Sequence, residues 1–103
     1  MKKTDKKIEN AIRESLTEVC EIALKDIDGF KWITHLVNYS NLPKSLSVVC
    51  IFDSDEAISS IVRSGQDEYL CLLIKQRLGA VNIHIKDTNK HVSFKTEESW
   101  LKK

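Results

Sequence analysis

The runs GFKWITHLVNY (residues 29–39) and LSVVCIF (residues 46–52) decide the fold of this chain. Both are rich in aromatic and β-branched residues, a composition typical of β-strands. Between them Pro43 follows Leu42, and proline pushes the residue before it out of the helical region, which indicates a turn. The two runs therefore predict a β-hairpin. The expected cross-strand pairs are Trp32 with Phe52, Thr34 with Cys50, and Leu36 with Val48.

In this register the second face of the hairpin is apolar as well. If helices cover the face that carries Trp32 and Phe52, an apolar patch stays open, and monomeric proteins rarely expose such patches. We therefore predict a face for contact with another protein or a second copy of the chain. The alternative is that the C-terminal segment around Trp100 covers it. The candidate interaction face comprises Ile33, His35, Val37, Tyr39, Val49 and Ile51.

Two segments that flank the hairpin have helical periodicity. From about Thr4 to Asp28, apolar residues recur every three or four positions, which predicts a helix. Gly29 is expected to end this helix in the left-handed conformation. After the hairpin, Asp53-Ser54-Asp55-Glu56 is similar to a capping box, with Asp53 as the N-cap of a second helix.

The second helical segment continues to residue 78, but polar residues interrupt it around Gly65. Because glycine adopts positive φ at little cost, we predict a kink at Gly65, with Asp67 capping the second piece. Apolar and polar residues then alternate in 81–86 and again in 91–95, which predicts a second hairpin.

These elements predict an α+β fold of two layers, in the order α-β-β-α(kinked)-β-β. The helices are expected to pack on one face of a four-stranded, mainly antiparallel sheet. The 103 residues suffice for one domain, so we expect a single domain over 1–103 with 1–4 and 102–103 frayed.

Charge, hydropathy and cysteines narrow the function classes. Sixteen basic and fifteen acidic residues give a net charge of +1, which excludes a strongly basic DNA-coating protein. No apolar run approaches the roughly 18 residues needed to span a bilayer, and the basic N-terminus lacks the apolar core of a signal peptide. The three cysteines are scattered and flanked by apolar residues, which is typical of free thiols in a reducing compartment. We expect a cytoplasmic protein with no membrane contact.

No motif predicts a reaction, a metal site or a cofactor. A histidine site needs a nearby carboxylate or a second ligand, but residues 29–52, which include His35, contain no Asp or Glu, and His84 and His91 are expected to lie diagonal to each other rather than opposed. Asp53-x-Asp55 begins like a calcium loop, but the required glycine and closing glutamate are missing. We therefore expect a small non-enzymatic interaction module without cofactors, acting as a homodimer or through a protein partner.

The alternative is an RNA- or ribosome-associated protein that binds through a positively charged sheet side. Residues 75–103 carry seven basic and three acidic residues, a net charge of +4, and residues 31–52 carry two lysines and no acid. Such a surface attracts phosphates. The candidate nucleic-acid contacts are Lys31, Lys86, Lys90 and Lys95.

Two resemblances accompany these patterns. The order helix–strand–strand–helix–helix–strand over residues 5–86, with Gly65 between the two middle helical pieces, resembles the type II KH arrangement, which implies an RNA-binding fold. In place of the G-x-x-G clamp of KH domains this chain has Ser64-Gly65-Gln66-Asp67. The runs 29–39 and 46–53 also resemble short uncharacterised proteobacterial proteins. Some of these are labelled Fis-type regulators, but no functional residue is carried over because the C-terminal third here alternates as strands do.

Overall fold

The structure, a computed structural model, describes residues 3–38 and 44–101. The described ranges leave out Tyr39 of the candidate interaction face. They also leave out Met1–Lys2 and Lys102–Lys103, which are part of the ends that were expected to be frayed. The elements are α1 (Lys3–Asp26), β1 (Phe30–Leu36), β2 (Ser47–Phe52), α2 (Asp55–Ser64), α3 (Gln66–Gly79), α4 (Thr88–His91), β3 (Val92–Thr96) and α5 (Glu97–Leu101).

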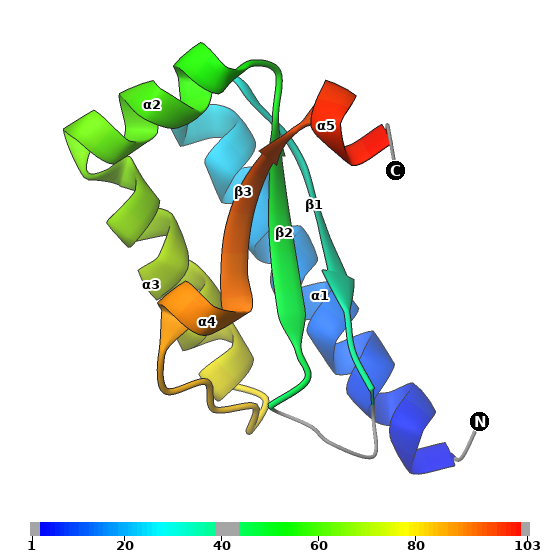
Figure 1. The fold of residues 1–103 in the computed structure, drawn as a ribbon. Helices are drawn as coiled ribbons and strands as arrows, with labels where there is room; N and C mark the ends of the chain where they lie inside the picture. Colours follow the sequence, from blue (N-terminus) through cyan, green and yellow to red (C-terminus); the bar gives the residue numbers. More distant parts are fainter. Residues whose placement is uncertain (1–2, 39–43, 102–103) are drawn as a thin grey trace.

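A sheet of order β1-β2-β3 separates the longer helices from the C-terminus (Figure 1). Helices α1 and α3 contact each other on one side of the sheet, while the short α5 lies on the other. The core fills the space between the sheet and α1 and α3. Alternate β2 residues Val48, Cys50 and Phe52 enter it, where they join Ile12 and Val19 of α1 and Leu70, Ile74 and Leu78 of α3. With a radius of gyration of 13.5 Å, the chain forms one small α+β domain.

The prediction of a four-stranded, mainly antiparallel sheet is wrong. In the described residues the sheet has three strands and is mixed, because β1 pairs antiparallel with β2 whereas β2 pairs parallel with β3. The reason lies in the connection between β2 and β3. It contains α2, α3 and α4, and a long helical crossover returns the chain to the same end of the sheet, which makes the two strands parallel.

The alternation in residues 81–86 does not form the predicted strand. Directly after α3 the chain reverses through tight turns, and Asn82 takes a left-handed φ of 66°. Ile83 and Ile85 are buried. The alternation of apolar and polar residues therefore arises because this irregular segment packs two side chains into the core. Asp87 then caps α4 by accepting a hydrogen bond from the Asn89 N–H, so the predicted turn before residue 91 is helical.

The Gly65 kink is confirmed, but both predicted caps are wrong. Gly65 has φ 83° between α2 and α3, and the N-cap position of α3 makes no side-chain hydrogen bond, so Asp67 does not cap it. Ser54 is the N-cap of α2, since its extended backbone directs Oγ to accept from the Ala57 N–H at 3.2 Å. Asp53 instead accepts a hydrogen bond from the Ser54 hydroxyl.

Replacing Gly65 by alanine is expected to destabilise the protein by about 1 kcal/mol. The cost comes from the left-handed backbone alone, because an added Cβ has no atom within 4 Å apart from its chain neighbours. Urea denaturation of both proteins measures it. An increase in stability would contradict a left-handed φ at this position.

The hairpin prediction is confirmed for its strands and wrong for its register. The observed partners of Trp32, Thr34 and Leu36 are Ile51, Val49 and Ser47, one residue from the expected pairs, and the register shifts between Phe30 and Trp32. Because side chains alternate across a strand, a slip of one residue exchanges the two faces. Trp32 therefore lies on the face opposite Phe52.

Candidate interaction surfaces

The sheet face opposite α1 carries side chains in cross-strand rows, and we call it the outer sheet face. It is defined by the residues that alternate with those entering the core. The rows are Trp32–Ile51–Lys95, Thr34–Val49–Ser93, and Leu36–Ser47.

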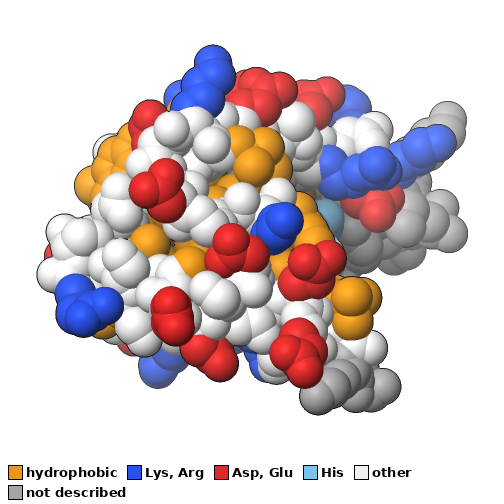
Figure 2. Space-filling model, turned by 90° about the horizontal axis from the view of Figure 1, so that it is seen from above, with side chains coloured by type: hydrophobic (Ala, Val, Ile, Leu, Met, Phe, Trp, Pro, Cys, Tyr) orange, Lys and Arg blue, Asp and Glu red, His pale blue; other side chains and the backbone are white. Residues whose placement is uncertain are grey.

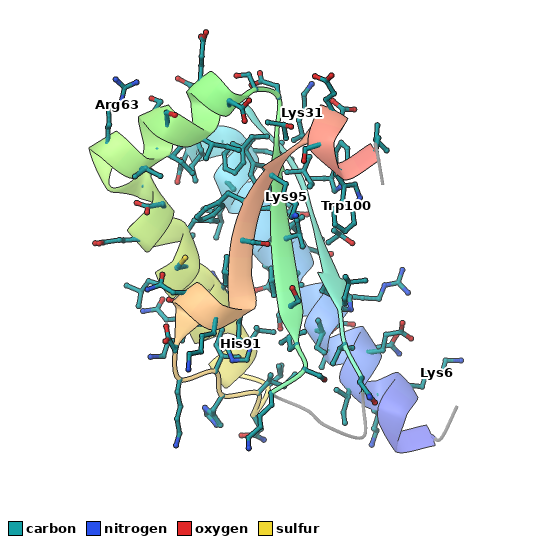
Figure 3. All side chains as sticks on the ribbon, in the orientation of Figure 1. Lys6, Lys31, Arg63, His91, Lys95 and Trp100 are labelled. Carbon is teal, nitrogen blue, oxygen red and sulfur yellow. The ribbon has the colours of Figure 1, made fainter. Side chains whose placement is uncertain are left out.

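The first of these rows lies next to α5. The chain turns from Thr96 directly into α5, which contacts β2 and β3 and crosses the upper end of the outer sheet face (Figure 1). Trp100 lies on this side of the sheet and is half-buried (Figure 3). Ile51, in the row next to α5, is 0% exposed, and Val49, in the second row between Thr34 and Ser93, is 3% exposed. The C-terminal segment thus covers part of the face, as the alternative prediction expected.

The rest of the outer sheet face is open and uncharged. Leu36 is 53% exposed, and Thr34, Ser47 and Ser93 are each half-buried. No Asp, Glu, Lys or Arg occurs in the second and third rows. An exposed leucine in an uncharged part of a sheet face, with a buried valine near it, is suited to contact with another protein surface.

The structure divides the candidate interaction face between the two sides of the sheet. Ile33 and His35 pair with Cys50 and Val48, so they face α1, and Val37 packs against the core. Val49 and Ile51 face outward but are buried, and Tyr39 lies outside the described residues. The residues that sequence reasoning missed are Thr34, Leu36, Ser47 and Ser93. The alternation of residues in β1 did indicate that Trp32 and Leu36 share one face of the sheet. Because of the register shift, that face is the outer one and not the core face that was expected.

His35 lies in a groove of about 320 Å³ between α1 and β1, which Arg13 and Cys20 also line. Burial lowers the pKa of His35, the charge of Arg13 lowers it further, and Glu9 opposes the change. The folded protein therefore disfavours the imidazolium form of His35.

The free energy of unfolding is expected to decrease as the pH falls below about 6.5, the ordinary pKa of histidine. There the unfolded chain takes up a proton at His35 that the folded chain does not, and the decrease levels off once the pH is below the lowered pKa. Urea denaturation of wild type and His35→Gln between about pH 7 and pH 5 tests this. The variant should have the flatter profile, and parallel profiles would contradict the assignment to His35.

The edge of the sheet at β1 is covered by α1. β1 is an edge strand, and α1 contacts it. The backbone of Ile33 hydrogen-bonds the Cys20 thiol of α1, and it partly offsets the burial that raises the pKa of that thiol. Covering an edge strand in this way hinders the addition of another strand. The outer sheet face is therefore the more accessible surface on this side.

The three cysteines are free, and they are separated by the layers of the fold. Cys50 is fully buried in β2, whereas Cys20 and Cys71 are half-buried on α1 and α3. Burial raises the pKa of all three thiols. Within the described ranges, no three His, Cys, Asp or Glu side chains converge as metal ligands would. No helix there has both the length and the apolar character to cross a membrane.

The four candidate nucleic-acid lysines are exposed but do not share one surface. Lys31 and Lys95 lie toward the end of the sheet where β1 begins (Figure 3). Lys86 precedes α4 and Lys90 lies within it, at the opposite end (Figure 1). Acidic side chains are spread over the end formed by α2 and α5, as Figure 2 shows from above. On this end of the molecule Asp53 is bound through its backbone N–H to the Gly29 carbonyl, two residues before Lys31, so phosphates that approach Lys31 meet at least this carboxylate.

Comparison of the chain with known proteins does not assign it to a family. No family model matches the chain, and neither the curated proteins nor the solved structures include a significant match to it.

Proposed function

We propose that the protein is a small non-enzymatic interaction module that forms a homodimer through the open part of its outer sheet face. The observation that carries this proposal is Leu36, 53% exposed in an uncharged part of the outer sheet face near the buried Val49. In β2 every residue from Val48 to Phe52 is apolar and buried. Such a strand is suited to a sheet whose two faces are both covered.

A second copy of the chain is the occupant that fits this surface best. Two-fold symmetry places the same patch on both subunits, and an uncharged patch does not repel itself. Two sheets pack face to face at about 10 Å with interdigitated side chains, for which serines and threonines around a leucine leave room. A stable dimer buries about 800 Å² per partner, roughly an eighth of the 6757 Å² surface of this domain.

Sedimentation velocity tests the proposal over micromolar to millimolar concentrations. The 11.8 kDa chain should approach twice its mass as the concentration rises. Leu36→Glu should weaken the dimer at least about tenfold, because it places an unpaired charge in the interface. Val62→Glu is the matched control, since Val62 is equally exposed but lies on α2. A monomer at every concentration, or equal effects of the two variants, would contradict the proposal.

RNA binding is the competing function, and the separation of the lysines gives it less support. A filter-binding assay with single-stranded RNA at low salt distinguishes the two functions, because phosphate contacts weaken steeply as salt increases. Salt-sensitive retention that Lys86→Glu and Lys90→Glu abolish would favour RNA binding at the α4 end. Absence of retention is the result expected here.

A further inference from the structure

A second surface lies at the β3 edge of the sheet, on the side of the helices. A groove of about 340 Å³ runs between α3 and β3, and α4 closes one end of it through Thr88 and Asn89. We call this the β3 groove. It is separate from the open part of the outer sheet face, because Val92 and Phe94 of β3 line it with the side chains that pair with Val48 and Cys50 on the core side.

The β3 groove has a mixed lining, in which four apolar or thiol side chains lie among charged and polar ones. Phe94 forms one wall and is held by an edge-to-face contact with Phe52 at 5.9 Å between ring centroids. Cys71 and Leu72 of α3 form the other, and Leu72 is 52% exposed. Phe94 and Leu72 thus offer apolar contacts from a strand and a helix to a side chain that enters the groove.

The backbone along the groove is that of an edge strand. β3 pairs with β2 on one side only. Apart from that ladder, Ser93, Phe94 and Lys95 make no backbone hydrogen bond with the described part of the chain. Unlike β1, whose edge α1 covers, β3 presents free N–H and C=O groups between its contacts with α2 and α4. An extended segment can pair with such groups by strand addition.

The charge of the groove is polarised. Asp67 and Glu68 line the end near the start of α3, and Lys75 lies two turns further along the same helix. None of the three forms an ion pair with another described residue. Two unpaired carboxylates at one end favour a basic ligand and repel the phosphates of RNA.

We propose that the β3 groove binds an extended basic segment of a partner protein. The segment adds as a strand alongside β3, inserts an apolar side chain between Phe94 and Leu72, and places lysine or arginine next to Asp67 and Glu68. The groove and the proposed dimer use side chains on opposite faces of the sheet, and they share only Ser93, whose side chain is on the outer sheet face and whose backbone is at the β3 edge.

Amide chemical shifts of the ¹⁵N-labelled protein test the proposal. The probe is a heptapeptide with acetylated N-terminus and amidated C-terminus, in which valine alternates with polar residues. The first two polar residues are lysine, and any other polar residue is serine. Titration should shift the amides of Ser93, Phe94, Lys95 and Leu72. A peptide with glutamate in place of lysine should bind at least about fivefold more weakly, because it meets like charges at Asp67 and Glu68.

The double variant Asp67→Asn, Glu68→Gln should weaken binding of the lysine peptide about fivefold. The matched control is Asp55→Asn, Glu56→Gln, which removes the same pair of charges from the first turn of α2, outside the groove, and should leave binding unchanged. Oligouridylate should shift none of these amides. The proposal is overturned if the lysine peptide leaves Ser93–Lys95 unshifted, if both double variants weaken it equally, or if oligouridylate occupies the groove. The dimer proposal is tested separately, by comparing the self-association of the wild-type protein with that of the Leu36→Glu variant. The groove proposal and the dimer proposal can therefore fail independently.

Discussion

Replacing Gly29 by alanine is expected to destabilise the protein by about 3 kcal/mol, because two costs add. Gly29 has φ 85°, a backbone conformation that costs a residue with a Cβ about 1–2 kcal/mol. An added Cβ would also lie 2.5 Å from the Ala57 Cβ and 3.1 Å from an Asp53 carboxylate oxygen. These neighbours belong to the β2–α2 junction, which the hydrogen bond from the Asp53 N–H to the Gly29 carbonyl ties to the end of α1.

Gly65→Ala is the matched control for this prediction, since Gly65 has nearly the same φ and no neighbour within 4 Å of an added Cβ. The difference between the two losses, measured by urea denaturation, isolates the steric cost at Gly29. Gly29→Ala should cost less stability when it is made in the Ala57→Gly variant than when it is made in the wild-type protein, because the clashing Cβ of residue 57 is then absent. Equal losses of stability for Gly29→Ala and Gly65→Ala would show that α2 does not lie close enough to Gly29 to clash with an added Cβ.

Phe52→Ala is expected to cost about 3–5 kcal/mol, a large share of the stability of a domain of this size. Phe52 is fully buried at the end of β2 and makes edge-to-face contacts with Phe30 at 5.6 Å and Phe94 at 5.9 Å. Its ring therefore joins β1, β2 and β3 in the core. Truncation leaves a cavity in the middle of three strands, where the surrounding backbone can collapse only partly.

Denaturant titration followed by circular dichroism measures this loss. Phe52→Leu should be less harmful, because it keeps most of the apolar volume and loses mainly the two aromatic contacts, about 0.5–1.5 kcal/mol each. Leu24→Ala on α1 is the control for removing an apolar side chain that is 54% exposed, and it should change stability little. If Phe52→Ala and Leu24→Ala cost the same, Phe52 does not hold the three strands together.

The candidate surfaces could be predicted only in part. The inference that the sheet has a second, partly apolar face rested on residues of both strands, and of those in the described ranges only Val49 and Ile51 of β2 lie on that face. The residues assigned to β1 were displaced by one, because the register shift between Phe30 and Trp32 leaves no mark in the sequence. The β3 groove was not predicted, since it joins α3, α4 and β3, segments whose proximity depends on the parallel placement of β3.

Elements that depend on neighbours along the chain could be predicted from the amino-acid pattern alone. The apolar spacing of α1, the composition of β1 and β2, and the glycines at 29 and 65 act within a few residues, so their effects are visible locally. The tertiary structure decided which residues face which layer, because one residue of register exchanges the faces of β1. It also decided between residues 81–86 and 92–96 as the third strand. Both alternate, but only the later segment is carried by the crossover to the free edge of β2, where its backbone hydrogen bonds are satisfied.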